Sequence, residues 1–147
     1  MRGTIPALAT TAVAEVARYC CELEEDNFAV GFDSGCLHVY GSDGVIISTA
    51  ELNERIIGLA NSDGNIVAAT STGGVRALHS KLLWEYGIES GCEMICAHPD
   101  GVLVADSSDR LLLISPQGGL LASIECKSPV AITHSTAVSY THLRAHE

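Results

Sequence analysis

Basic residues are scarce in this chain of 147 residues, which carries eight Lys and Arg against 18 Asp and Glu and a formal net charge of −10 at pH 7. Because nucleic-acid phosphates are bound by clustered basic side chains, this balance argues against a nucleic-acid partner. The same excess of acidic residues disfavours binding to an anionic membrane surface. We interpret the acidic surplus as a solvated surface that aids solubility, with an acidic host cytoplasm or a cationic partner as the alternatives.

Long hydrophobic runs are also missing. No stretch reaches the roughly 18 consecutive apolar residues of a transmembrane helix, so we expect no membrane span. Residues 1–18 are rich in Ala and Thr, poor in Leu and interrupted by Glu15, which does not match a secretory leader.

The chain lacks the cysteine pattern of a disulfide framework. Its six cysteines mostly fall inside apolar runs, where Cys packs as a small hydrophobic residue: Cys20, Cys21, Cys36, Cys92, Cys96 and Cys126. Reduced core cysteines favour a cytoplasmic protein, although the compartment is otherwise unknown.

Fingerprints of catalysis are absent as well. There is no Gly-x-Ser-x-Gly, no P-loop and no dinucleotide-binding pattern. Gly73 and Gly74 lie between two strand-like segments rather than before a helix, so they do not form a phosphate loop. We therefore expect no catalytic residue and no cofactor, and the chain leans away from being an enzyme.

The chain does contain an internal repeat. Residues 64–78 match residues 27–40 after a shift of 38 and residues 102–114 after a shift of 36. The match extends upstream without a gap, where residues 57–60 lie opposite residues 19–22 and 93–96. A fixed period in the high thirties is the signature of a repeat architecture.

Each repeat reads as four short strands. The apolar runs are about five or six residues long and are bounded by turn dipeptides such as Asp43-Gly44, Asp63-Gly64 and Asp100-Gly101. The second run is apolar on both faces, which indicates a sheet covered on both sides. We predict an all-β chain, a partial β-propeller of about three four-stranded antiparallel blades, at about 19–50, 56–87 and 93–125.

Incomplete blades are expected at both ends. Residues 3–9 and 130–135 match single strands of the repeat. Residues 137–147 break the pattern and resemble a translated sequencing adapter, so we interpret them as a non-native tail. Since propellers typically need four to eight blades, we interpret the chain as a fragment of a larger propeller. The connections 51–55 and 88–92 carry charge or Gly and are expected to be exposed.

Residues 63–86 resemble a known family. The order Asp-Gly, strand, Ser-x-Gly-Gly, strand, Leu82-Leu83-Trp84-Glu85-Tyr86 is similar to the quinoprotein-type (PQQ-like) propeller repeat. The family docks a tryptophan between blades, whereas the other repeats here carry Ile47 and Ala122 near the place of Trp84. We expect structural roles for five residues: Trp84, Gly31, Gly64, Gly73 and Gly101.

The resemblance suggests one cofactor site. Quinone-dependent dehydrogenases of this family hold a disulfide between adjacent cysteines against the cofactor, and Cys20-Cys21 has that sequence. Cys21 falls opposite Leu59 and Ile95, which are plain apolar positions. The alignment therefore favours core packing over a vicinal disulfide.

Four sets of residues have metal-ligating chemistry, but none has the spacing of a known metal motif. Cys92, Cys96 and His98 would share one face of a strand, yet they lack a zinc-knuckle pattern, and His98 reads as a turn residue. Turn chemistry explains Asp33-Ser34 and residues 106–109 better than calcium does. His142 and His146 have helical spacing but no third ligand nearby. We expect no metal site.

These observations favour a non-catalytic propeller segment that acts as a protein-interaction or ligand-sensing scaffold, with an unidentified protein partner. The alternatives are part of a quinoprotein-like oxidoreductase, or a module for envelope assembly or adhesion. The fold alone does not choose among them, because this superfold carries many activities.

Overall fold

The computed structural model describes residues 15–79 and 81–126, and their regular secondary structure is almost entirely strand. Twelve strands form three four-stranded antiparallel sheets, in the orders β1-β2-β3-β4, β5-β6-β7-β8 and, in the third, β12-β11-β10-β9. We refer to these sheets as blades 1, 2 and 3. The predicted all-β propeller-like fold is confirmed.

Consecutive strands pair with one another throughout. Blade 1 contains β1 (Ala17–Glu22), β2 (Phe28–Phe32), β3 (Cys36–Tyr40) and β4 (Ile46–Glu51), with one 3-10 turn at Glu24–Asp26. Blade 2 contains β5 (Ile56–Ser62), β6 (Asn65–Thr70), β7 (Gly74–His79) and β8 (Lys81–Gly87). Blade 3 contains β9 (Cys92–His98), β10 (Gly101–Asp106), β11 (Arg110–Ile114) and β12 (Leu120–Glu125).

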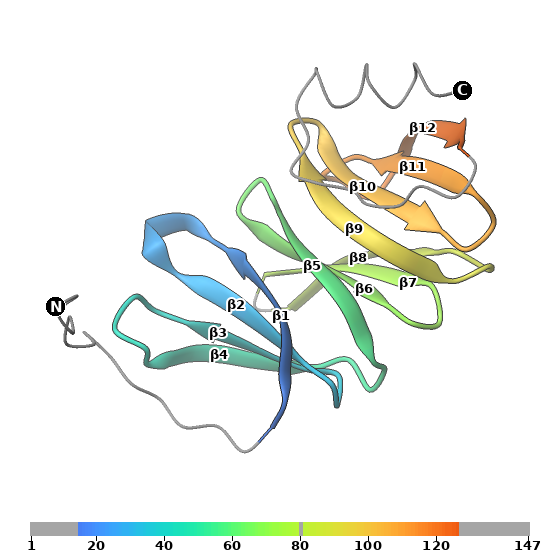
Figure 1. Cartoon of the computed structure of the whole chain (residues 1–147). Helices are drawn as coiled ribbons and strands as arrows, with labels where there is room; N and C mark the ends of the chain where they lie inside the picture. The colour runs from blue at the N-terminus through green and yellow to red at the C-terminus, as the bar shows by residue number, and fades with distance from the viewer. Residues whose placement is uncertain (1–14, 80, 127–147) are drawn as a thin grey trace, which may run out of the picture.

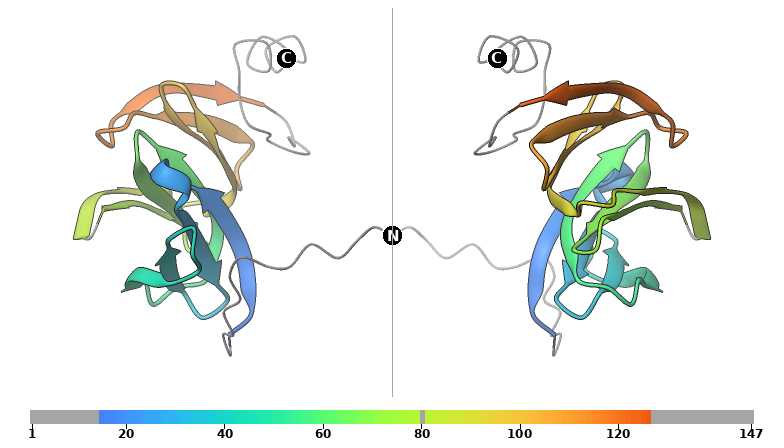
Figure 2. Two further views of the ribbon diagram at one scale, coloured as in Figure 1. Left: turned by 90° about the vertical axis from the view of Figure 1, so that its left-hand side faces the viewer. Right: turned by 90° about the vertical axis from the view of Figure 1, so that its right-hand side faces the viewer.

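The blades stack through their first strands. β5 packs against β1 on one side and β9 on the other, and the three sheets fan outward from this line (Figure 1). Side views show the twist of each sheet and the outward position of the later strands (Figure 2). Twisted sheets with a common inner edge are the geometry of propeller blades.

Both faces of the middle blade are buried. Val67 and Val75 point into an apolar cluster shared with blade 3, whereas Ile66 and Ala68 point into a cluster shared with blade 1. Period-2 alternation therefore sends successive residues of β6 to opposite neighbours. This explains why the run is apolar without a polar face.

The hairpin turns follow the expected chemistry at one site and depart from it at another. Asp63 and Gly64 have φ of 53° and 85° and close a two-residue turn between β5 and β6, as in a type I′ hairpin. In blade 3 the turn residues are Pro99 and Asp100, and Gly101 is already the first residue of β10. The prediction of an Asp-Gly turn at residues 100–101 was therefore wrong by one position.

The ungapped upstream alignment was also wrong in blade 1. Cys21 pairs with Ala29, whereas the equivalent residues Ala60 and Cys96 pair with Val67 and Leu103. The β1–β2 connection contains the 3-10 turn and is one residue longer relative to the paired strands. Cys21 therefore corresponds to Ala60 and Cys96, not to Leu59 and Ile95.

Two residues in the connections between blades are buried, contrary to expectation. Leu52 is 6% exposed and Ile88 is 4% exposed. The backbone N–H of Leu52 donates to the Gly35 carbonyl at 2.9 Å, and that of Ile88 donates to the Gly73 carbonyl at 2.8 Å. These bonds hold each connection against the β2–β3 or β6–β7 hairpin, so its apolar residue turns into the core.

The expected strands at 3–9 and 130–135 and the tail at 137–147 lie outside the described residues. Within the described part of the chain, no helix is long and apolar enough to cross a membrane.

Candidate functional site

A groove opens between blades 1 and 2, on the side of their outer strands. Its volume is about 650 Å³. The β1–β2 connection and the facing strands of both blades contribute its lining: Leu23, Glu24, Glu25, Asn27, Leu37, Val39, Ile47, Ser48, Thr49, Ala50, Gly64, Ile66, Leu78, His79, Lys81 and Leu82. We call this feature the blade 1–2 groove.

Small side chains on β4 explain why the groove exists. Ser48 pairs with Val39 and Ala50 pairs with Leu37. At the same positions of blade 2, Trp84 pairs with Ala77 and Tyr86 with Val75. Blade 1 therefore presents a hydroxymethyl and a methyl group to its neighbour where blade 2 presents two aromatic rings.

The aromatic pair closes the corresponding space between blades 2 and 3. The Trp84 indole Nε1–H donates to the Pro116 carbonyl at 2.8 Å, and its ring lies against Gly118. Trp84 and Tyr86 are both half-buried and pack on the apolar cluster between these blades. A side chain placed at Gly118 would collide with the indole, since an added Cβ would lie 2.8 Å from ring atoms.

The outer hairpins also differ. In blade 3, the five residues 115–119 between β11 and β12 reach the Trp84 ring. In blade 2, β7 ends at His79 and β8 begins at Lys81, and these two residues pair. The short hairpin and the small residues on β4 act together to leave the groove open.

The floor of the groove is apolar and its mouth is mixed. Leu37 and Ile66 are buried at 2% and 7% exposure, whereas Ile47 and Leu82 stand at the mouth with 57% and 52% exposure. Glu24 and Glu25 lie at one end, in the 3-10 turn, and His79 and Lys81 lie on blade 2. An apolar cleft with a few charged groups at its edge is typical of a binding site.

Hydrogen bonds of Arg76 hold the connection between blades 1 and 2 against blade 2. Arg76 of β7 donates to the Leu52 carbonyl at 3.0 Å and to Glu54 Oε2 at 2.8 Å, both in the connection between the blades. Its Nε also bonds Glu85 Oε2 at 2.6 Å. The hydrogen bond that Arg76 donates to Glu85 is the largest influence that raises the pKa of Arg76.

The glycines expected to be structural occupy different environments. Gly31 faces Ile56 and Leu59 of blade 2, and Gly64 closes the β5–β6 turn. Gly73 has φ of 100°, and a Cβ there would overlap the carbonyl oxygen of Ile88. Gly101 has φ of 147° and is equally close to the carbonyl oxygen of Ile114.

The metal candidates Cys92 and Cys96 are not brought together, and His142 and His146 lie outside the described residues. Glu93 is an extra residue opposite β10, because Met94 pairs with Ala105 and Cys92 with Asp106. This bulge reverses the alternation, so Cys92 packs towards blade 2 and Cys96 on the opposite face. The expectation that these cysteines share a face was wrong. His98 Nδ1 accepts the backbone N–H of Asp100 at 3.0 Å, which is a turn bond.

All six cysteines are free thiols in the structure, including the adjacent pair Cys20 and Cys21. Burial raises the pKa of Cys21 to about 12, with a smaller contribution from Cys20. Cys21 packs at the blade 1–2 interface, whereas Cys20 is exposed. The Cys21 thiol is therefore poorly suited to act as a nucleophile.

The Asp106 carboxylate accepts hydrogen bonds from other residues of the β10–β11 hairpin in blade 3. Asp106 is 2% exposed, and its oxygens accept the N–H groups of Ser108 and Arg110 at 2.9 Å each and the Arg110 Nε–H at 2.8 Å. Burial by itself would raise the pKa of Asp106, but these bonds outweigh it and the pKa is lowered. The Asp106 carboxylate therefore stabilises the turn between β10 and β11.

The blade 1–2 groove was not predicted from the sequence. Its signal was present as Ser48 and Ala50 at the places of Trp84 and Tyr86, but finding it requires the strand register. Ile46 pairs with Tyr40 and Leu82 pairs with Leu78, so the hairpin between the third and fourth strands is two residues longer in blade 1 than in blade 2. For that reason Ile47 was matched to Trp84 in place of Ser48.

The chain matches no family model and no curated protein. Among solved structures it is similar to Raptor from Chaetomium thermophilum, with a TM-score of 0.71, 13% identity, and coverage of 86% of this chain and 13% of that chain. It is also similar to BBS1N in complex with ARL6DN, with a TM-score of 0.69, 15% identity and coverage of 80% and 43%. BamB from Moraxella catarrhalis gives a TM-score of 0.67, 16% identity and coverage of 76% and 38%.

These similarities define the class of fold. At such low identity they establish β-propeller architecture and no specific activity. The chain spans 13% and 43% of the length of the first two structures. What distinguishes this chain must therefore be read from its own residues, and above all from the blade 1–2 groove.

Proposed function

We propose that this chain is a non-catalytic propeller segment that binds a partner protein, and that the blade 1–2 groove holds a short segment of that partner. The observation that carries the proposal is the groove itself, with its buried aliphatic floor and two exposed aliphatic side chains at the mouth. Its volume of about 650 Å³ falls within the range of ligand-binding pockets.

The lining specifies the chemistry of the segment. Leu37, Ile66 and Leu78 offer an apolar surface that suits an aliphatic or aromatic anchor. Glu24 and Glu25 are exposed at one end of the groove, in a chain with a net charge of −10. A Lys or Arg of the partner that is close to the anchor would pair with these carboxylates and increase the association rate.

A solved neighbour supports protein binding as the general activity. BBS1N is a propeller-like structure that was determined in complex with ARL6DN. Because fold similarity does not transfer a partner, this comparison supports the class of activity only.

We also propose that the repeats are of the quinoprotein type. The support is the position of Trp84, whose indole spans from blade 2 to the Pro116 carbonyl and Gly118 of blade 3. Among the described residues, nothing favours the oxidoreductase alternative, since Cys20 and Cys21 are free and Cys21 is a packing residue. A module for envelope assembly would use the same groove and differ in its compartment.

A peptide-display selection on the immobilised full chain tests the proposal. We expect the selected peptides to combine one large apolar residue with a nearby Lys or Arg, and to lose binding to the variants Ser48→Trp and Ile47→Glu. Leu121→Glu is the matched control, because Leu121 occupies the position of Ile47 in blade 3 and is similarly exposed, at 55% against 57%. Peptides that bind Ser48→Trp as tightly as the natural chain would refute the groove as the docking site.

A further inference from the structure

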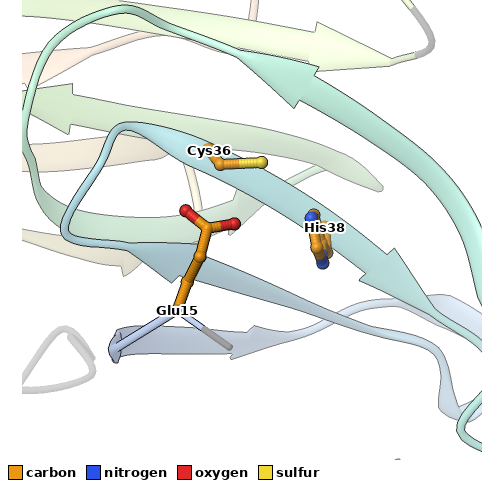
Figure 3. A group of neighbouring side chains, drawn as sticks. All are labelled: Glu15, Cys36 and His38. Atoms are coloured by element: carbon orange, nitrogen blue, oxygen red, sulfur yellow. The ribbon is translucent and has the colours of Figure 1, made fainter. Parts of the chain in front are cut away.

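Three chemically different ligand groups converge on blade 1, outside the groove. A carboxylate oxygen of Glu15, the Cys36 sulfur and a ring nitrogen of His38 all lie within 4.8 Å of one another (Figure 3). It is the one such group of three found among the described residues. We propose that Glu15, Cys36 and His38 form a binding site for a divalent transition-metal ion, with zinc as the expected metal.

The fold places two of the ligands side by side. Cys36 and His38 are two positions apart on β3, so they project from the same face of the strand. The intervening Leu37 packs into the apolar cluster shared with blade 2. The metal ligands therefore lie on the face of blade 1 that is directed away from blade 2 and from the groove.

Backbone and side-chain bonds bring the third ligand to this face. The N–H of Asp33 donates to the Val16 carbonyl at 3.1 Å, which attaches the segment before β1 to the β2–β3 hairpin. The Ser34 hydroxyl donates to Glu15 Oε1, and Arg18 pairs with Asp33 at 3.0 Å. Glu15 is thus held over the hairpin, although it is remote from Cys36 in the sequence.

His38 is oriented by its aromatic neighbours. Its Nδ1 lies 2.9 Å from the Tyr40 hydroxyl, and its ring makes an edge contact with Phe32 at a centroid distance of 4.7 Å. An Nδ1 that is engaged in a hydrogen bond leaves Nε2 as the ligand atom. Metal-binding histidines are commonly held in this way, with the second ring nitrogen bonded to a neighbouring group.

The donor set favours zinc over harder cations. Thiolate and imidazole ligands suit zinc and other late transition metals, whereas calcium and magnesium prefer oxygen alone. One thiolate and one carboxylate would also balance the charge of a divalent ion. Three protein ligands leave a coordination position for water, as in open zinc sites.

Two carboxylates lie near the Cys36 thiol. Burial raises the pKa of Cys36, and the negative charges of Glu15 and Glu51 raise it further. Glu51 also accepts the N–H of Asn53, at 3.2 Å.

Cobalt substitution tests the site in the full, reduced chain. We expect Co²⁺ to bind at one equivalent with a thiolate-to-cobalt charge-transfer band, and Zn²⁺ to displace it. Cys36→Ser should abolish the band and His38→Gln should weaken binding strongly. Tyr40→Phe should lower Co²⁺ affinity by about tenfold, because it removes the partner that orients His38.

Two controls separate this site from other thiols and histidines. Cys20→Ser, and the double variant His142→Ala/His146→Ala, should each retain the band. A band that survives in Cys36→Ser, or no thiolate band at all in the natural chain, would overturn the proposal.

A second measurement does not depend on how well the variants fold. Zn²⁺ should slow alkylation of Cys36 in the natural chain, as measured by mass spectrometry, and leave the exposed Cys20 unaffected. Equal rates of Cys36 alkylation with and without Zn²⁺ would count against the site.

Discussion

The two interfaces between blades are built from the same repeat, yet one is closed and the other is open. Between blades 2 and 3, Trp84 and Tyr86 of the outer strand pack over the apolar cluster. Between blades 1 and 2, Ser48 and Ala50 stand at the same register positions and leave a groove of about 650 Å³.

The difference shows which parts of a blade are constrained. Both interfaces have buried apolar clusters along the inner strands, and in both the hairpin between the second and third strands bonds to the following connection. Because each repeat gains stability by stacking on its neighbours, these shared features hold the array together. The outer strand adds less to the shared core, so its residues can differ and give one interface a binding groove.

Substitutions at the hairpin contacts that both interfaces share should cause the largest losses of stability. Gly35 and Gly73 have φ of 93° and 100°, and a Cβ would overlap the backbone of Glu54 in one case and of Ile88 in the other. We expect Gly35→Ala and Gly73→Ala each to lower the free energy of unfolding by about 3 kcal/mol, from backbone strain and the clash. Urea denaturation would measure both.

Gly87→Ala is the control for this pair, since a Cβ at Gly87 has no atom within 4 Å and should change stability by less than about 0.5 kcal/mol. If only one of Gly35→Ala and Gly73→Ala were destabilised, the two interfaces between blades would differ at their hairpin contacts as well as at their outer strands.

Removing the Trp84 ring should open the closed interface between blades 2 and 3. Trp84→Ala removes a half-buried indole and its bond to the Pro116 carbonyl. Large aromatic truncations in full cores cost about 3–5 kcal/mol, so partial burial suggests a loss of about 2–3 kcal/mol. Chemical denaturation gives the value, and a change under about 1 kcal/mol would show that the indole does not stabilise the blade contact.

Much of the fold could be predicted from the sequence, since a period in the high thirties and short two-faced apolar runs dictate stacked four-stranded sheets. The errors came from single-residue irregularities. The 3-10 turn at Glu24–Asp26 and the bulge near Glu93 each shift a strand by one position. Such a shift moves a side chain to the opposite face, which is why Cys92 and Cys96 were placed together.

The candidate sites were harder to predict than the fold. The groove is a result of small residues on β4, and small residues carry no chemical motif. The Glu15, Cys36 and His38 cluster needs a long-range contact between the segment before β1 and β3, which no local spacing reveals. In contrast, His98 and the polar hairpin at residues 106–109 have local turn bonds, and these were correctly read as turns.

Low pH should weaken the β10–β11 hairpin of blade 3 more than the β6–β7 hairpin of blade 2. In blade 3 the buried Asp106 carboxylate accepts backbone N–H groups, whereas in blade 2 Thr70 uses its hydroxyl to bond Gly74 N–H at 3.1 Å. The pKa of Asp106 is lowered from its ordinary value of 3.8, so its contribution is complete above that pH and is lost as the pH falls through the lower folded value.

Asp106→Asn should therefore lower the free energy of unfolding by about 1–2 kcal/mol at pH 7. The difference from the natural chain should shrink when unfolding is followed below pH 3.8. Thr70→Val, the matched change in blade 2, should show a loss that does not vary over this pH range. A constant difference for Asp106→Asn would mean that its charge does not stabilise the hairpin.

The smallest effect on stability should come from closing the open interface. Ser48→Trp places an indole over Leu37, Val39 and Ile66, which already line the groove. Burying part of its apolar surface at about 25 cal/mol per Å² is opposed by lost side-chain entropy and by a short β7–β8 hairpin that offers no equivalent of Pro116. We expect a gain of about 0.5–1 kcal/mol in denaturant unfolding. Intrinsic fluorescence of Ser48→Trp in a Trp84→Phe background would report whether the new indole is shielded from water. A fully exposed indole, or a loss of more than about 1 kcal/mol, would show that the groove is too narrow or too rigid to admit a side chain of that size, and would weaken its assignment as a docking site for an apolar anchor.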